Sequence, residues 1–202
     1  MDGIYFYWIA WIIWTLSTFF MKKNNERLII TIIILMLIIF SATILQVATF
    51  KINASLLIAL LSSYLFLSIN TKNKTRRIVY ILLCTLTITT AYVSFQLFEL
   101  FDPIWLVFNR KIMLAFCLVY LTLLLVKDAK TRIICAVIGA SQGEFLYAFI
   151  LSDFRFDYEV GSLLFFDVLA ISVFTLFIWG SLEDLVQYFD TYFQKTTKEK
   201  HG

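Results

Sequence analysis

The feature that most constrains this chain is a series of apolar runs, each about 20 residues long, joined by short segments that hold most of the charge. A helix needs about 20 mainly apolar residues to cross the roughly 30 Å hydrocarbon core of a bilayer, and the runs match that length. Lipid offers no water to the backbone, so each run must satisfy its own N–H and C=O groups as a helix. A transmembrane barrel would require strands that alternate polar and apolar residues, and the runs lack that alternation.

The composition agrees with a membrane protein. The chain is 61% hydrophobic and 15% charged, whereas soluble domains are about 45–50% apolar and about 25% charged. We therefore predict an all-α fold, a polytopic transmembrane helical bundle with seven spans. The expected spans are residues 4–21, 28–50, 54–69, 78–101, 103–126, 133–151 and 160–179, followed by a cytoplasmic amphipathic helix and polar tail over 181–202.

The start of the fifth span has two alternatives. Asp102 and Pro103 end the preceding helix, because proline disfavours helical geometry in the residue before it. A span that begins at Pro103 places Arg110 about 10 Å below its start, within reach of buried acids. A span that begins near Lys111 leaves 103–108 as a short interfacial helix and makes Arg110 an interfacial anchor.

The chain changes character after the seventh run. Ser181, with Asp184 three residues later, forms a capping box that predicts the start of a new helix. Its apolar and polar residues separate onto two faces, so we expect the helix over 181–194 to lie in the membrane interface or to dock on a partner membrane protein. The apolar face consists of Leu182, Leu185, Val186, Phe189, Tyr192 and Phe193, and the polar face of Glu183, Asp184, Gln187 and Asp190.

The basic residues predict the orientation. Seven spans place alternate loops on opposite sides of the membrane. Of the 17 Lys and Arg residues, 13 fall in the loops after spans one, three and five and in the C-terminal tail, and only Lys51, Arg110, Lys111 and Arg155 fall on the other side. Cytoplasmic loops carry the excess of Lys and Arg. We therefore expect the N-terminus outside and the C-terminus inside.

Two acids, Glu144 and Asp167, lie deep within apolar runs. A charge at the centre of a transmembrane helix costs about 2.5–3.5 kcal/mol on insertion scales, so such residues face the bundle interior and pair. The predicted topology places both in the outer half of the bundle. The expected polar layer there consists of Gln96, Glu99, Arg110, Gln142, Glu144 and Asp167. It either fixes helix register, or forms a small site for a proton, an ion or a polar ligand.

Gly139 and Gly143 form a GxxxG pattern, which in a transmembrane helix lets a second backbone approach closely. We expect this seam to pack inside the bundle. The same residues formally read GxSxG around Ser141, but a nucleophile elbow needs a strand-to-helix turn and a histidine partner. The chain has one histidine, His201, in its tail. No catalytic residues are therefore predicted.

Other classes of function lack their motifs. The basic residues occupy separate short loops rather than one stripe, so no nucleic-acid partner is expected. Cys84, Cys117 and Cys135 lie within apolar runs and form no CxxC pair, as is typical of small buried hydrophobic residues. No His pair or HExxH motif predicts a metal, and no phosphate-binding or dinucleotide motif predicts a cofactor.

Four stretches resemble a known family. YFYWIAWIIWTLSTFFMKK near the start, LFELFDPIW, GASQGE and GSLLFFDVLA resemble the YphA-like family, small multi-pass membrane proteins of spore-forming bacilli. The resemblance covers nearly the whole chain. It implies a protein of the bacterial cytoplasmic membrane. The family has no established activity, so the resemblance supplies no functional residues.

The function that these patterns favour is non-enzymatic. We expect a membrane-embedded assembly or accessory protein, because the loops are short, the lipid-compatible surface is large and the tail helix is suited to docking. The alternative is a small transporter or a ligand or proton sensor that uses the outer polar layer between the fourth and seventh spans. Replacing Glu144 with Gln separates the two, because a purely structural layer would lose stability without any change in a ligand or proton response.

Overall fold

The computed structural model describes residues 2–47, 50–70, 75–102, 104, 106, 108–154 and 156–200, except for the side chains of Glu26, Asn70, Thr75 and residues 190–200. This part of the chain forms seven helices and three short strands. The helices are α1 (Ile4–Phe19), α2 (Asn25–Phe40), α3 (Ala54–Asn70), α4 (Thr75–Phe101), α5 (Arg110–Leu125), α6 (Ala129–Asp153) and α7 (Leu163–Lys200). The strands are β1 (Ile44–Val47), β2 (Phe50–Asn53) and β3 (Glu159–Val160).

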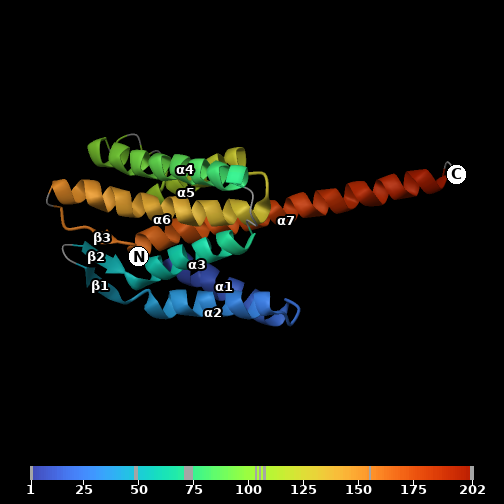
Figure 1. Cartoon of the computed structure of the whole chain (residues 1–202), viewed down its shortest axis with the longest axis horizontal. Helices are drawn as coiled ribbons and strands as arrows, with labels where there is room; N and C mark the ends of the chain where they lie inside the picture. Colours follow the sequence, from blue (N-terminus) through green and yellow to red (C-terminus); the bar gives the residue numbers. More distant parts are fainter. Residues whose placement is uncertain are drawn as a thin grey trace.

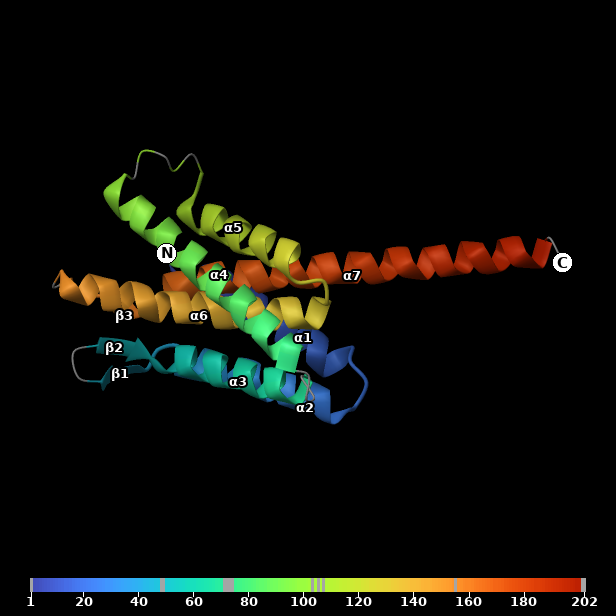
Figure 2. The same cartoon turned by 45° about the horizontal axis from the view of Figure 1, so that its top comes forward.

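The helices run roughly alongside one another, and α6 lies among them (Figure 1). Helix α6 packs against α3, α4, α5 and α7, and it is buried along most of its length. The β1–β2 hairpin lies at one end of the bundle, which we call the hairpin end. Helix α7 extends far past the other helices at the opposite end, the tail end, where the α1–α2 and α5–α6 connections also lie (Figures 1 and 2).

The second apolar run does not form the expected helix over 28–50. Helix α2 ends at Phe40, and the chain continues into β1 and β2, which pair antiparallel. β3 then joins β2 in parallel. Hydrogen bonds from side chains explain the early end: the Asn53 amide donates to the Ser41 carbonyl at 2.8 Å, and the Asn53 side-chain oxygen accepts from the Ser55 N–H at 3.0 Å. Asn53 thus satisfies terminal backbone groups of both α2 and α3.

The expected separate helix over 181–194 is also wrong. Helix α7 continues without a break from Leu163 to Lys200, so Gly180 and Ser181 are interior positions. The Ser181 hydroxyl donates to the Phe177 carbonyl one turn earlier, at 2.9 Å, instead of capping a new helix. Helix α7 passes close to the start of α6 here, since a Cβ at Gly180 would lie 3.1 Å from the Cβ of Ala129.

Helix α5 begins at Arg110, which agrees with the later of the two predicted starts. The alternative start, Pro103, lies outside the described residues. With 16 residues, α5 is about 24 Å long at 1.5 Å per residue, so it is shorter than the hydrocarbon core of a bilayer.

Three helices in the described part of the chain are long and apolar enough to cross a membrane, namely Arg76–Phe101, Ala129–Asp153 and Leu163–Phe189. Ile4–Phe19, Arg27–Phe40 and Ala54–Ile69 are apolar but shorter. The fold is therefore a helical bundle with three long apolar helices, and the count of seven spans is a proposal.

Candidate functional site: two buried acid clusters

The first cluster surrounds Glu144 on α6, whose side chain is completely buried. One carboxylate oxygen accepts hydrogen bonds from the Tyr158 hydroxyl at 2.8 Å and the Gly161 N–H at 3.2 Å. The other accepts from the Tyr92 hydroxyl of α4. Each of the three partners carries an O–H or N–H group that can donate to the carboxylate oxygens. Glu144 therefore ties α6 both to α4 and to the turn before α7, where Gly161 has a left-handed φ of 78°.

A chain of side chains connects Glu144 to Arg110. The guanidinium of Arg110 can only donate, so the side-chain oxygen of Gln96 faces it. The Gln96 amide then donates to the Tyr92 hydroxyl at 2.9 Å, which leaves that hydroxyl to donate to Glu144. Every hydrogen bond in the chain thus points toward Glu144. The Arg110 Nε atom also lies 2.7 Å from a carboxylate oxygen of Glu99, as an ion pair at the outer edge of this cluster.

The second cluster surrounds Asp167 on α7, which is also completely buried. Its carboxylate accepts from the Lys111 ammonium at 2.6 Å, the Gly3 N–H at 2.8 Å and the Phe6 N–H at 2.9 Å. Gly3 is the N-cap residue of α1 and has a φ of 89°. Asp167 therefore supplies the acceptor that the first N–H groups of α1 lack within their own helix. Its negative charge also interacts favourably with the positive, N-terminal end of the α1 dipole.

Lys111 bridges two acids at the start of α5. Its ammonium lies 3.0 Å from the Asp2 carboxylate as well as 2.6 Å from that of Asp167. It also lies 5.9 Å from the centre of the Tyr5 ring, within the range of a cation–π contact. The hydrogen bond and positive charge of Lys111 hold the pKa of Asp2 below its usual value. The N-terminal segment is thus attached to both α5 and α7.

The structure divides the predicted polar layer. Gln96, Glu99, Arg110 and Glu144 belong to one connected cluster, and Asp167 belongs to the other. Gln142 joins neither by a direct hydrogen bond: its amide donates to the Tyr64 hydroxyl of α3, and its oxygen accepts from Thr89 at 3.3 Å.

Four members of these clusters were missed by the sequence reasoning: Tyr92, Tyr158, Lys111 and Asp2. Tyr92 carried a usable signal, because it lies four residues before Gln96 and therefore on the same face of one helix. The other three lie near the ends of apolar runs, where interfacial exposure is the ordinary interpretation. Among the described residues, no group of three or more His, Cys, Asp or Glu side chains is arranged to hold a metal ion.

Gly139 and Gly143 both face α4. A Cβ on Gly139 would lie 2.6 Å from Ile88 Cγ2, and one on Gly143 would lie 2.6 Å from Tyr92 Cδ1. The Thr89 hydroxyl donates to the Gly139 carbonyl at 3.0 Å across the same seam. Residues 139–143 are helical, so the GxSxG pattern lacks the strand-to-helix turn of a nucleophile elbow. The close approach instead positions Tyr92 beside Glu144.

Comparison with known proteins agrees with this apolar bundle. A family model described as "YphA-like integral membrane protein" matches residues 2–202. The chain belongs to the YphA-like family of integral membrane proteins. The resemblance inferred from four short stretches is thereby confirmed. The "Uncharacterized protein YphA" of Bacillus subtilis (strain 168) is similar to this chain, with 25% identity over 202 residues that cover 100% of the chain and 98% of the relative. No solved structure matches the chain.

Proposed function

We propose that this protein is a non-enzymatic assembly or accessory protein of the bacterial cytoplasmic membrane, and that residues 181–194 of α7 bind a helix of a partner membrane protein. The observation that carries the proposal is the continuation of α7 past the ends of all the other helices (Figure 1). A membrane protein with short loops has little other surface on which to recognise a partner in the cytoplasm.

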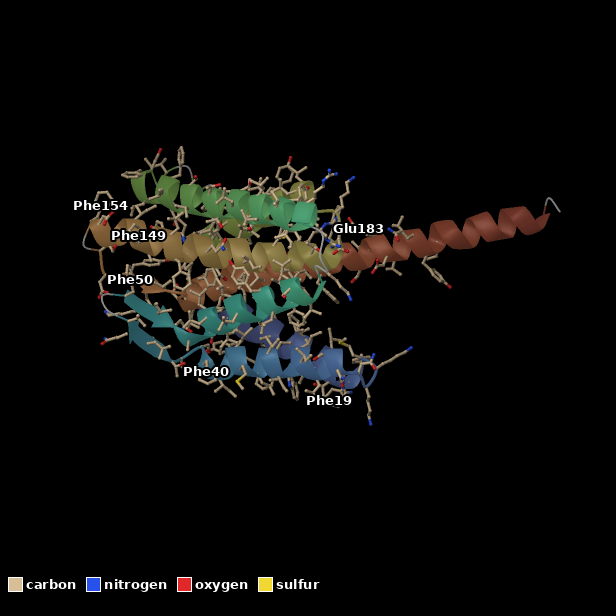
Figure 3. The ribbon with its side chains drawn as sticks, in the orientation of Figure 1. Phe19, Phe40, Phe50, Phe149, Phe154 and Glu183 are labelled. Carbon is tan, nitrogen blue, oxygen red and sulfur yellow. The ribbon has the colours of Figure 1, made fainter. Side chains whose placement is uncertain are left out.

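Contacts at the tail end fix the direction in which α7 projects from the bundle. The Glu183 carboxylate accepts from Arg132, at the start of α6, and from the Trp179 indole N–H, both at 2.7 Å. Glu183 thus lies where α7 leaves the bundle (Figure 3). Because Gly180 also packs against Ala129, α7 is anchored immediately before it projects. Residues after Glu183 are therefore carried away from the other helices in a defined direction.

The projecting helix has an exposed apolar face. Leu182, Leu185 and Phe189 are each more than half exposed, and their spacing of three and four residues is that of a helix-pairing seam. Val186 and Tyr188 widen this face, while Glu183, Asp184 and Gln187 lie outside the seam. An exposed apolar surface of this kind typically marks an interaction site. A partner helix with a similar apolar stripe would bury it.

The two acid clusters support a structural rather than a chemical role for the polar layer. The carboxylates of Glu144 and Asp167 each accept three hydrogen bonds, and the donors come from parts of the chain that must be held together. The chain from Arg110 to Glu144 passes through the amide of Gln96, which neither gains nor loses a proton in the physiological range. A proton relay would need a titratable group or a water at that point.

The proposed membrane orientation places the tail end in the cytoplasm, with seven spans and the N-terminus outside. The distribution of Lys and Arg supports it, since the tail end collects the basic residues of the α1–α2 and α5–α6 connections. The three shorter apolar helices and α5 would complete the seven spans, with local thinning of the bilayer or burial against the longer helices.

One observation favours the alternative, a transporter or a ligand or proton sensor. The side chain of Arg110 is 32% exposed and that of Glu99 is 17% exposed, so the chain of hydrogen bonds to Glu144 has one end near the surface. An anionic ligand that displaced Glu99 from Arg110 would alter a chain that reaches the bundle interior. If the protein is such a transporter or sensor, its ligand should bind at the hairpin end and not at the tail end.

The test of the assembly proposal is gentle extraction from native membranes through a C-terminal tag, followed by native mass spectrometry. A photo-crosslinking amino acid placed at Leu185 should capture the partner before extraction. The matched control places it at Gln187, on the polar face of the same turn. A protein adduct at position 185 but not at 187 would support the proposal. A protein released without any partner, and with no adduct at 185, would overturn it.

A further inference from the structure

A cavity at the tail end has the features of a lipid headgroup site. It lies between α4, the end of α5 and the start of α6, and its volume is about 340 Å³. The charged lining residues are Arg77, Lys127 and Asp128, and the apolar lining includes Tyr80, Ile81 and Leu124. The two cations outnumber the one acid, so the lining carries a net positive charge beside an apolar wall. It lies far from the two acid clusters of the hairpin end.

The guanidinium of Arg77 has capacity for a further anion. Its nearest acid, Asp128, lies at 3.9 Å, the outer limit of an ion pair. Asp128 is engaged elsewhere, because its carboxylate caps α6 by accepting from the N–H of Thr131 at 3.0 Å and from the Thr131 hydroxyl. Arg77 also donates weakly to Thr131 Oγ1, at 3.3 Å, and its side chain is 46% exposed.

The depth of the cavity matches the boundary between headgroups and acyl chains. Arg77 lies in the first turn of α4, and Ile81 lies four residues further along it, about 6 Å deeper. The Tyr80 hydroxyl donates to the Leu125 carbonyl, so the ring is held across the cavity wall between these two levels. Lys127 follows the last turn of α5, at the level of Arg77. Leu124 is 66% exposed and extends the apolar wall toward lipid.

We propose that this cavity binds one anionic phospholipid in the leaflet at the tail end. Arg77 and Lys127 pair with the phosphate, because basic pockets at the cytoplasmic ends of transmembrane helices favour anionic headgroups and Arg binds phosphate oxygens through two N–H groups. The first carbons of an acyl chain lie against Ile81 and Leu124. The site requires only that the tail end contact the membrane surface, so it is independent of the proposed partner helix.

Native mass spectrometry of the full-length protein, released from detergent with defined lipids, tests the site. The probes are phosphatidylglycerol and, as the zwitterionic comparison, phosphatidylcholine. The double variant Arg77→Gln with Lys127→Gln is compared with Lys22→Gln plus Lys23→Gln, which removes the same charge from another connection at the same end. We expect the first variant to lower retention of phosphatidylglycerol about tenfold relative to the control variant.

Three outcomes would overturn the proposal. The first is an equal loss in both double variants, which would indicate attraction to the general positive charge of the tail end. The second is equal retention of phosphatidylglycerol and phosphatidylcholine by the unaltered protein. The third is displacement of phosphatidylglycerol by inorganic phosphate at millimolar concentration, which would indicate a free-anion site. Thermal unfolding without added lipid checks the fold of each variant, and the single change Lys127→Gln keeps the test valid if loss of Arg77 prevents folding.

Discussion

Arg110 and Lys111 are consecutive residues in the first turn of α5, yet their cationic groups pair with acids in two different clusters. Arg110 pairs with Glu99 of α4, and Lys111 pairs with Asp167 of α7. Successive side chains on a helix diverge by about 100°, so neighbours in the sequence face different sides of the bundle. The start of α5 is thereby held between α4 and α7.

Replacing Asp167 with Asn should lower stability strongly. The change removes the charge that pairs with Lys111, whose side chain is only 12% exposed, and weakens the cap of α1. Removing one partner of a buried ion pair costs about 3–5 kcal/mol. The control Asp2→Asn alters the other carboxylate on Lys111, which is 58% exposed, and should lower stability much less because solvent screens an exposed ion pair. Thermal or denaturant unfolding in detergent measures both, and similar losses for the two variants would contradict the role assigned to Asp167.

Replacing Glu144 with Gln distinguishes the two proposed functions. The NH2 group of glutamine would replace one carboxylate oxygen, so either the Tyr92 hydroxyl, or the Tyr158 hydroxyl and the Gly161 N–H, would lose the acceptor to which they donate. The expected loss is about 1–3 kcal/mol in the free energy of unfolding, as for unsatisfied buried polar groups. The nearby change Glu159→Gln in β3, at a partly exposed position, should have a small effect. A Glu144→Gln protein of unaltered stability that loses a measured ligand or proton response would refute the structural interpretation.

Replacing Gly143 with Ala should disturb the seam between α4 and α6. The added methyl group would lie within 3.0 Å of three atoms of Tyr92, so that ring must move and its hydrogen bond to Glu144 must lengthen. Overpacking of this kind costs about 1–3 kcal/mol. Gly180→Ala is the matched control: its methyl group meets only Ala129 Cβ, at 3.1 Å, and the higher helix propensity of alanine opposes that contact. If both variants unfold at the same temperature, close packing at Gly143 is not required.

The stability of the protein should fall at low pH partly through Asp128. Hydrogen bonds from Thr131, assisted by the charge of Arg77, hold the pKa of this carboxyl below its usual value. A depressed folded-state pKa contributes stability above the unfolded-state pKa, near 3.9, and the contribution is lost as the pH falls through the folded-state pKa. Asp128→Ala should therefore cost about 1 kcal/mol at pH 7, as for a lost helix cap, and less at the lowest pH. Unfolding temperatures of both proteins between pH 2 and pH 7 should converge at the acid end, and a constant difference would show that ionisation is not involved.

The location of the helices followed from the apolar runs, but their ends did not. The stretch 41–50 is less apolar than the helix before it, but it carries no charge and six of its ten residues are apolar, so composition alone extended the expected span to Phe50. The bond between Asn53 and the Ser41 carbonyl, which ends the helix, joins residues 12 apart in the sequence. At the C-terminal end, Gly180 and Ser181 carried local signals of a break. The contacts with Ala129 and Arg132, which belong to another helix, determine that α7 continues.

For the candidate site, too, the sequence predicted some features and missed others. The free-energy cost of placing an acid within an apolar run indicated that Glu144 and Asp167 are buried and paired. The partners could not be assigned, because those of Asp167 include Gly3, 164 residues away, and Lys111, 56 residues away. The backbone N–H groups at the start of α1 and at Gly161 carry no sequence signature as donors, since every residue except proline has one.

By itself, the sequence determined that this is an integral membrane protein built from helices, that it belongs to the YphA-like family, and that two acids lie within its bundle. The membrane helices and the burial of the two acids depend on the transfer of side chains between water and hydrocarbon, which is a sum over local composition. Only the tertiary structure decided which acid meets which cation, where α2 ends and that α7 projects as one helix. Those outcomes depend on contacts between distant segments, whose geometry is set when the helices pack and not by the residues of any one segment.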